Sequence, residues 1–145
     1  MTTIDSASAR TEGTTRGIIL STLLGGAVAS VANAIVAFAG LAAGADPAIQ
    51  GLTPPAYITL SVLGVLAGAI GWNVIRRARS AGRILAVLVP VMLVLSLIPD
   101  VLLAVSSGDG AVVTAAVTLG IMHVVTVAVA VPIYRAFLPI RNADR

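Results

Sequence analysis

The chain has 145 residues, of which 58% are hydrophobic and only 10% are charged. A soluble domain carries about 25% charged residues, and one small core cannot hide this much apolar surface, so the composition argues against a soluble protein and indicates one membrane domain. The net charge of +3 is the balance of nine arginines, without any lysine, and six acidic residues. The arginines lie only in short segments between apolar runs, and this position favours a topology signal over nucleic-acid binding.

The first apolar run follows a polar segment. Residues 1–16 are small, polar and of mixed charge, and they predict a disordered tail. Residues 18–43 contain no charge and are long enough to cross a bilayer core of ~30 Å as a helix. A cleaved secretory signal is the alternative for this run, because two arginines precede it. Gly25 and Ala29 belong to a small-residue stripe of the kind that lets helices approach closely.

The second apolar run begins after a predicted loop. Residues 44–56 contain Asp-Pro and Pro-Pro pairs and one glycine, which are turn and helix-start signals. Residues 57–75 are close to the minimum length for a span. Gly64, Gly68 and Gly71 lie nearly on one face of this helix, and their spacing predicts a helix contact.

The third run carries the acid that makes this sequence distinctive. Residues 76–83 are an arginine-rich segment that predicts a cytoplasmic turn able to contact anionic lipid headgroups. Its arginines are Arg76, Arg77, Arg79 and Arg83. Residues 84–105 then form an apolar run that contains Asp100. A carboxylate inside a span is energetically costly, so Asp100 marks a candidate functional site.

The fourth run covers residues 112–133 and contains His123, the only histidine. Residues 139–145 are predicted to form a cytoplasmic tail. The whole pattern predicts an all-α membrane domain over residues 17–138, a bundle of four transmembrane helices in which each short loop joins antiparallel neighbours.

Charge also predicts the orientation of this bundle. With four spans, the two terminal segments and the arginine-rich turn share one side, and they hold all nine arginines. The other side holds only Asp46 and Asp109. By the positive-inside rule, both termini are expected in the cytoplasm of a cell whose plasma membrane holds the protein.

Polar residues inside the spans form a candidate intramembrane site. They are Asp100, His123, Asn33 and Ser96. Counting helix rise from the outer end places Asp100 at about 8 Å depth and His123 at about 17 Å, and counting from the inner end of the first span places Asn33 at roughly the same depth as Asp100. Asp100 is therefore expected beside Asn33, whereas Asp100 and His123 differ by ~9 Å in depth and meet only through water, a bend or a long contact. Ser96 precedes Asp100 by one turn on the same face.

Three interpretations of Asp100 stay open. The carboxyl group is a structural one, hydrogen-bonded to Asn33, Ser96, a threonine or a carbonyl that a proline leaves unpaired. Alternatively it gates or carries protons or a cation, with His123 as a second station. In the third interpretation it faces an outer vestibule without a special role. His123 is correspondingly either a satisfied interhelical hydrogen-bonding group or a proton relay.

The sequence contains no evident catalytic or cofactor motif. Asp100 and His123 fall short of the three or four protein ligands of a zinc site, and the lack of cysteine excludes thiolate ligands. Ser96, His123 and Asp100 disagree in depth, and no nucleophile-elbow motif is present. No phosphate loop, dinucleotide fingerprint or haem motif occurs. We therefore expect no metal, no cofactor, no nucleic-acid partner and no enzymatic activity.

Several short features together resemble one family. They are the asparagine of the first span, the Thr-Pro-Pro before the second, the arginine-rich turn, the run Ser96-Leu97-Ile98-Pro99-Asp100 and the pair Met122-His123. Over residues 16–138 the chain resembles a family of small four-span bacterial membrane proteins known only as a domain of unknown function. The resemblance implies four spans and a bacterial cell membrane, and it assigns no activity to any residue.

Two functions follow as hypotheses. The first is a small membrane protein that acts by interaction, as a homo-oligomer or as a subunit beside another membrane protein in the lipid bilayer. The second is a minimal oligomeric transporter or channel in which Asp100 and His123 titrate.

Overall fold

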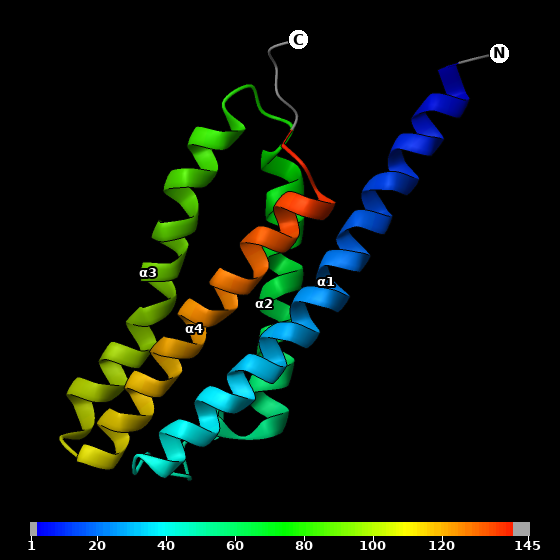
Figure 1. Ribbon diagram of the computed structural model, residues 1–145. Coiled ribbons are helices and arrows are strands. Elements are labelled where there is room, and N and C mark those ends of the chain that lie inside the picture. Colours follow the sequence, from blue (N-terminus) through cyan, green and yellow to red (C-terminus); the bar gives the residue numbers. More distant parts are fainter. Residues whose placement is uncertain (1–2, 141–145) are drawn as a thin grey trace.

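The computed structural model describes the backbone of residues 3–140 and the side chains from residue 14 onward. Within this part, the regular structure is entirely helical (Figure 1). The elements are α1 (Thr3–Ala42), the short 3-10 turn η1 (Gln50–Leu52), α2 (Pro54–Ile75), α3 (Ala81–Ser107) and α4 (Gly110–Phe137). Each of the four α-helices is long and apolar enough to cross a membrane, in α1 over Thr14–Ala42. The prediction of an all-helical protein with four spans is thus confirmed.

Local chemistry explains where the later helices begin and end. Pro54 occupies the first turn of α2, where its missing N–H costs nothing and its fixed φ suits the helix. The Asp109 side chain accepts a 2.8 Å hydrogen bond from the Ala111 N–H and so caps α4. Gly108 ends α3 with a φ of +65°, a left-handed conformation that glycine adopts without steric cost.

The first helix is longer than the sequence predicts. It begins at Thr3, so the expected disordered tail over residues 1–16 is instead helical from residue 3. Extending a helix that the span has already nucleated costs far less than starting one, which accounts for the difference. Residues 1–2 and residues 141–145 of the predicted C-terminal tail lie outside the described part of the chain.

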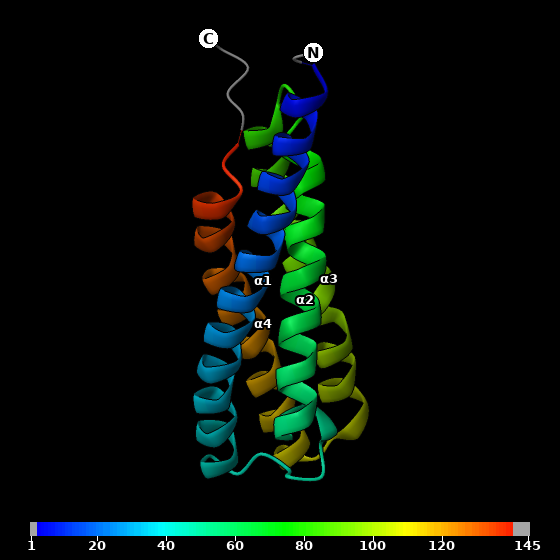
Figure 2. The same ribbon diagram turned by 90° about the vertical axis from the view of Figure 1, so that its right-hand side faces the viewer.

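The helices form a three-helix core with a fourth helix on its flank. α1 packs against both α2 and α4, whereas α3 packs mainly against α4 (Figures 1 and 2). α4 crosses the molecule obliquely, from beside α3 at its first turn towards α2 at its last turns (Figure 1). The turn 76–80 therefore joins two helices, α2 and α3, that share few contacts. The expectation that every short loop joins packed neighbours is wrong at this one loop.

Small side chains make the helix contacts possible. One cluster of buried residues lies in the half of the molecule near the 76–80 turn: Ala29, Val65, Ala69, Trp72, Leu85, Ala130, Tyr134 and Leu138. A second lies in the other half: Ala37, Ala45, Leu52, Ala115 and Met122. Large apolar side chains instead cover the outside, Phe38 on α1 being 75% exposed. Lipid is the solvent that suits such a surface.

Only some of the glycines that the sequence predicts at helix contacts pack against another helix of the chain. Gly25 lies against Val65 of α2, and Gly68 lies against the Tyr134 ring of α4. Ala29 is fully buried in the first cluster. Gly64 and Gly71 have open space where a Cβ would stand, so the three glycines of α2 do not form one contact face within a single chain.

Two further ties hold the end of the bundle near the 76–80 turn. The Trp72 indole is buried and donates a 2.9 Å hydrogen bond to the Leu138 carbonyl, which anchors the segment after α4 to α2. The Tyr134 hydroxyl donates a 2.6 Å bond to the Val65 carbonyl and ties α4 to the same helix. α2 and α4 are therefore bonded at two depths.

Adding a methyl group at Gly68 is expected to destabilise the fold. A Cβ there would stand 2.5 Å from the Tyr134 Oη, so Gly68→Ala forces the ring away and strains its bond to Val65. We expect a loss of about 1–3 kcal/mol of unfolding free energy in detergent. Gly64→Ala, one turn earlier in the same helix, meets nothing within 4 Å and is expected to be neutral or stabilising by up to ~1 kcal/mol. Equal effects of the two substitutions would contradict this packing.

Candidate intramembrane polar site

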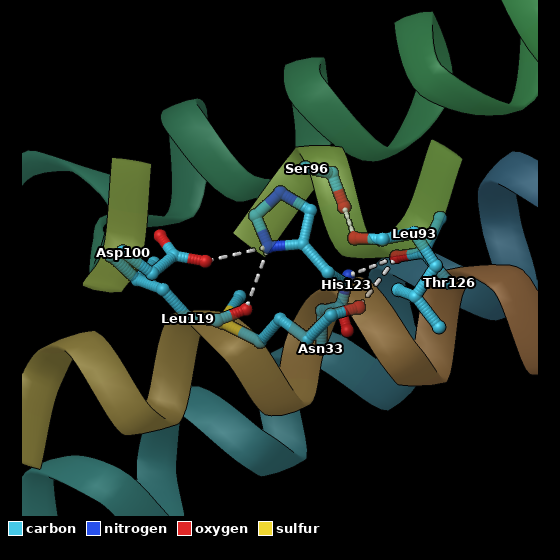
Figure 3. A network of polar contacts seen from close by, with 8 residues as sticks. Asn33, Leu93, Ser96, Asp100, Leu119, His123 and Thr126 are labelled. Carbon is cyan, nitrogen blue, oxygen red and sulfur yellow. Dashed lines mark hydrogen bonds and ion pairs between the residues drawn. The ribbon is translucent and has the colours of Figure 1, made fainter. Parts of the chain in front are cut away.

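Asn33 joins three helices through one amide group. Its Nδ2 donates a 2.9 Å hydrogen bond to the Ser61 Oγ of α2. A second bond, also of 2.9 Å, goes to the Thr126 Oγ1 of α4 (Figure 3). The Thr126 hydroxyl in turn donates a 2.8 Å hydrogen bond to the Met122 carbonyl. Asn33 is only 3% exposed, so these bonds satisfy donors that lipid could not. The amide therefore fixes the relative positions of α1, α2 and α4.

Asp100 and His123 meet directly between α3 and α4. The His123 Nδ1 lies 3.1 Å from the Asp100 Oδ2 and 3.0 Å from the Leu119 carbonyl oxygen (Figure 3). A carbonyl oxygen can only accept a hydrogen bond, so Nδ1 carries a hydrogen and donates a hydrogen bond to the Leu119 carbonyl. The Asp100 Oδ2 atom lies close to the ring, but it has no hydrogen-bond partner in the described chain. The pair is thus in contact, with the carboxylate oxygen still able to receive a proton.

This contact corrects the depth estimate made from the sequence. The estimate separates Asp100 and His123 by ~9 Å of helix rise and lets them meet only through water, a bend or a long contact. Side chains on a helix lean towards its N-terminus, and α3 and α4 run in opposite directions. The Asp100 and His123 side chains therefore lean towards each other and close the gap. Asn33, which the estimate places beside Asp100, bonds to Ser61 and Thr126 instead.

Part of the His123 ring faces the space between α2 and α3. Tyr134 faces α2, because its hydroxyl bonds to Val65, and His123 lies three helical turns earlier on the same face of α4. Since α2 and α3 share few contacts, nothing from the described chain closes over the ring. The His123 side chain is accordingly 42% exposed, against 11% for Asp100.

Ser96 does not complete a catalytic set. Its hydroxyl donates a 2.7 Å hydrogen bond to the Leu93 carbonyl one turn back in α3 (Figure 3). The Ser96 hydroxyl therefore donates within its own helix, and it is not the partner of Asp100 that the structural interpretation allows. Among the described residues, no group of three histidine, cysteine or acidic side chains lies together as a metal site would require.

The predicted polar residues thus separate into two clusters that meet on α4. Asn33 belongs to one and Asp100 with His123 to the other, and Thr126 lies one turn beyond His123. Ser61 and Thr126 belong to the polar site although they are not among the residues predicted for it. Their spans carry other hydroxyls, such as Thr59, Thr114 and Thr118, and serines and threonines in apolar helices commonly bond only to their own backbone, so the sequence does not distinguish the two.

The arginines of the predicted turn surround one end of the molecule. Arg76 caps α2 and donates to Asn73 Oδ1 at 2.9 Å, to the Pro139 carbonyl at 3.3 Å and to Thr14 Oγ1 at 3.3 Å. It therefore joins α2 to α1 and to the segment after α4. Arg77 and Arg79 are exposed in the turn, and Arg83 is exposed in the first turns of α3.

The amide of Asn33 is expected to couple energetically to Ser61. We predict that Asn33→Ala and Ser61→Ala, made singly and together, give a double-mutant cycle with a coupling of ~0.6 kcal/mol and at most ~1.7 kcal/mol in detergent unfolding. Both residues are buried, so neither bond can be replaced by water from outside. Strictly additive losses would show that the 2.9 Å contact carries no stability.

The comparisons with known proteins give a match to the profile of a protein family. Searches of curated proteins and of solved structures find no match to the chain. The profile of a family described as "Family of unknown function (DUF6069)" matches residues 13–139, which include all four spans and both polar clusters. The chain therefore belongs to the DUF6069 family.

Proposed function

We propose that this protein acts by association within the plasma membrane, first of all with a second copy of itself, and that it is not an enzyme. The half-exposed imidazole of His123 is the observation that carries this proposal. Hydrocarbon cannot solvate a ring that stands beside a carboxylate, so the 42% of its surface left open requires a polar or protein cover.

The open side of α2 supports a helix as that cover. Val62 packs against Gly26 of α1, and Gly68 packs against Tyr134 of α4. By the helical period, Gly64 and Gly71 lie on the far side of Gly68 from Val62, towards α3. Both glycines have open space above them, which suits the close approach of a helix from a second copy.

The proposed orientation has both termini in the cytoplasm. The described arginine side chains lie at the end of the molecule that holds the 76–80 turn: Arg16, Arg76, Arg77, Arg79, Arg83 and Arg135. The described acids in the loops, Asp46 and Asp109, lie at the opposite end (Figure 1). The positive-inside rule places the arginine end in the cytoplasm.

Self-association is testable by cysteine cross-linking, because the natural chain has no cysteine. In an isologous dimer a residue close to the two-fold axis lies near its own copy, and the proposed surface puts Gly64 there, so Gly64→Cys in vesicles is expected to give a covalent dimer with a short thiol-specific reagent. Phe38→Cys, on the lipid-facing side of α1, is the matched control and is expected to remain monomeric. Equal yields from both positions, or no dimer from either, would contradict the proposed surface.

Proton or cation movement is the second candidate function. The 3.1 Å contact of Asp100 with His123 favours it, because two titratable groups on different helices can exchange a proton inside the membrane. In this function water, rather than a protein surface, covers the open edge of His123.

A flux assay separates the two candidates. If the second one holds, vesicles that contain the wild-type chain dissipate an imposed pH gradient, and Asp100→Asn returns the rate to that of empty vesicles because an amide does not titrate. Asp109→Asn changes an acid that only caps α4 and is expected to leave the flux intact. A wild-type rate equal to that of empty vesicles would remove this candidate and leave the first in place.

A further inference from the structure

A groove opens on the flank of the bundle at the arginine end. It lies between α2, α3, α4 and the segment after α4, and it has a volume of about 410 Å³, within the size range of ligand sites. Trp72, Leu85, Val89 and Val131 form apolar walls. The groove lies where α3, which runs beside α4 near the loop that joins them, separates from α4 towards the arginine end (Figure 1).

One charged side chain lines this groove. Arg135 lies in the last turn of α4 and makes no hydrogen bond or ion pair with the described part of the chain. The arginines of the 76–80 turn lie at the same end of the molecule, and the described acids are elsewhere, in the opposite loops and in α3 near His123. The groove therefore presents an unbalanced positive charge at one end.

The groove also runs from charged to apolar along the helix axes. Arg135 stands within a turn of the end of α4, where lipid headgroups lie. Val89 lies eight residues into α3, which is about 12 Å along that helix towards the membrane interior. A ligand that fits must combine an anionic head with an apolar body of similar length.

We propose that this groove binds one anionic phospholipid, with its phosphate on Arg135 and one acyl chain along Leu85, Ala86 and Val89. Basic pockets between transmembrane helices on the cytoplasmic side are typical sites for anionic headgroups. Only a lipid supplies both the anion and the apolar chain from within the membrane. The site is separate from Asp100 and His123, and it does not require the proposed association.

Lipid retention by the purified full-length chain tests this assignment. Native mass spectrometry in a mild detergent would compare dioleoyl phosphatidylglycerol with dioleoyl phosphatidylcholine at equal concentration. We expect preferential retention of phosphatidylglycerol, about fivefold weaker binding in Arg135→Gln, and no change in Arg77→Gln, which removes an equal charge outside the groove.

A groove-filling variant tests the apolar half of the site. Ala86→Phe is expected to abolish retention with Arg135 still present, whereas Val87→Phe, on the neighbouring lipid-facing position, is expected to retain the lipid. Circular dichroism and thermal unfolding of each variant establish that its helices are intact. If Ala86→Phe does not fold, the pair Arg135→Gln and Arg77→Gln still decides the assignment.

Four results would overturn the proposal. They are equal retention of the two lipids, an unchanged affinity in folded Arg135→Gln, competition by inorganic phosphate as strong as by the lipid, and a loss of dimer mass without a loss of lipid in Ala86→Phe. The third result would mean a headgroup site without a bound chain, and the last would mean that a second copy fills the groove.

Discussion

The amide of Asn33 sets the arrangement of the bundle, because lipid gives helices no reason to prefer one register by hydrophobicity alone. Apolar side chains are equally well solvated by lipid and by one another, so close packing and directional bonds decide how helices meet. One buried amide that bonds to α2 and to α4 fixes three helices at a single depth. Glycines and alanines then allow the backbones to come as close as those bonds require.

α3 lies outside this arrangement. It bonds to no other helix through Asn33, and its close polar contact across helices in the described chain is that of Asp100 with His123. The helix that carries the acid is thus also the one held least firmly by packing. The space between α2 and α3, in which His123 is exposed and the groove opens, follows from this difference.

Much of the fold can be predicted from the sequence, for reasons that are local. Uninterrupted apolar runs define four spans, and prolines, Gly108 and Asp109 define several of their ends. Which helices pack against one another is harder to predict from the sequence. Charge and length do not reveal that α4 crosses the core and separates α3 from α2. A glycine stripe predicts that a face can pack, but Gly64 and Gly71 meet nothing within the chain, so the stripe does not identify which of its glycines lie at a helix contact.

The polar residues of the candidate site could be predicted from the sequence, but the contacts between them could not. Polar groups in lipid are costly, which is why Asn33, Asp100 and His123 stand out in the sequence. Helix rise gives the depth of a Cα atom, whereas the meeting of Asp100 with His123 depends on the lean of two side chains from antiparallel helices. Ser61 and Thr126 become recognisable only when Asn33 lies beside them.

Because α4 is the last helix in the described chain and packs against the other three, the bundle is complete only after α4 has been inserted. During synthesis α1 and α2 enter the membrane first, and they can pair through Asn33 and Ser61 while later segments are still being made. α3 follows and finds little surface to pack against, because its main partner has not yet been inserted. Only when α4 arrives do Thr126, Tyr134 and His123 complete the contacts of all three earlier helices. Until that moment the nascent chain carries an acid, Asp100, in a helix whose partner for that acid, His123, has not yet entered the membrane.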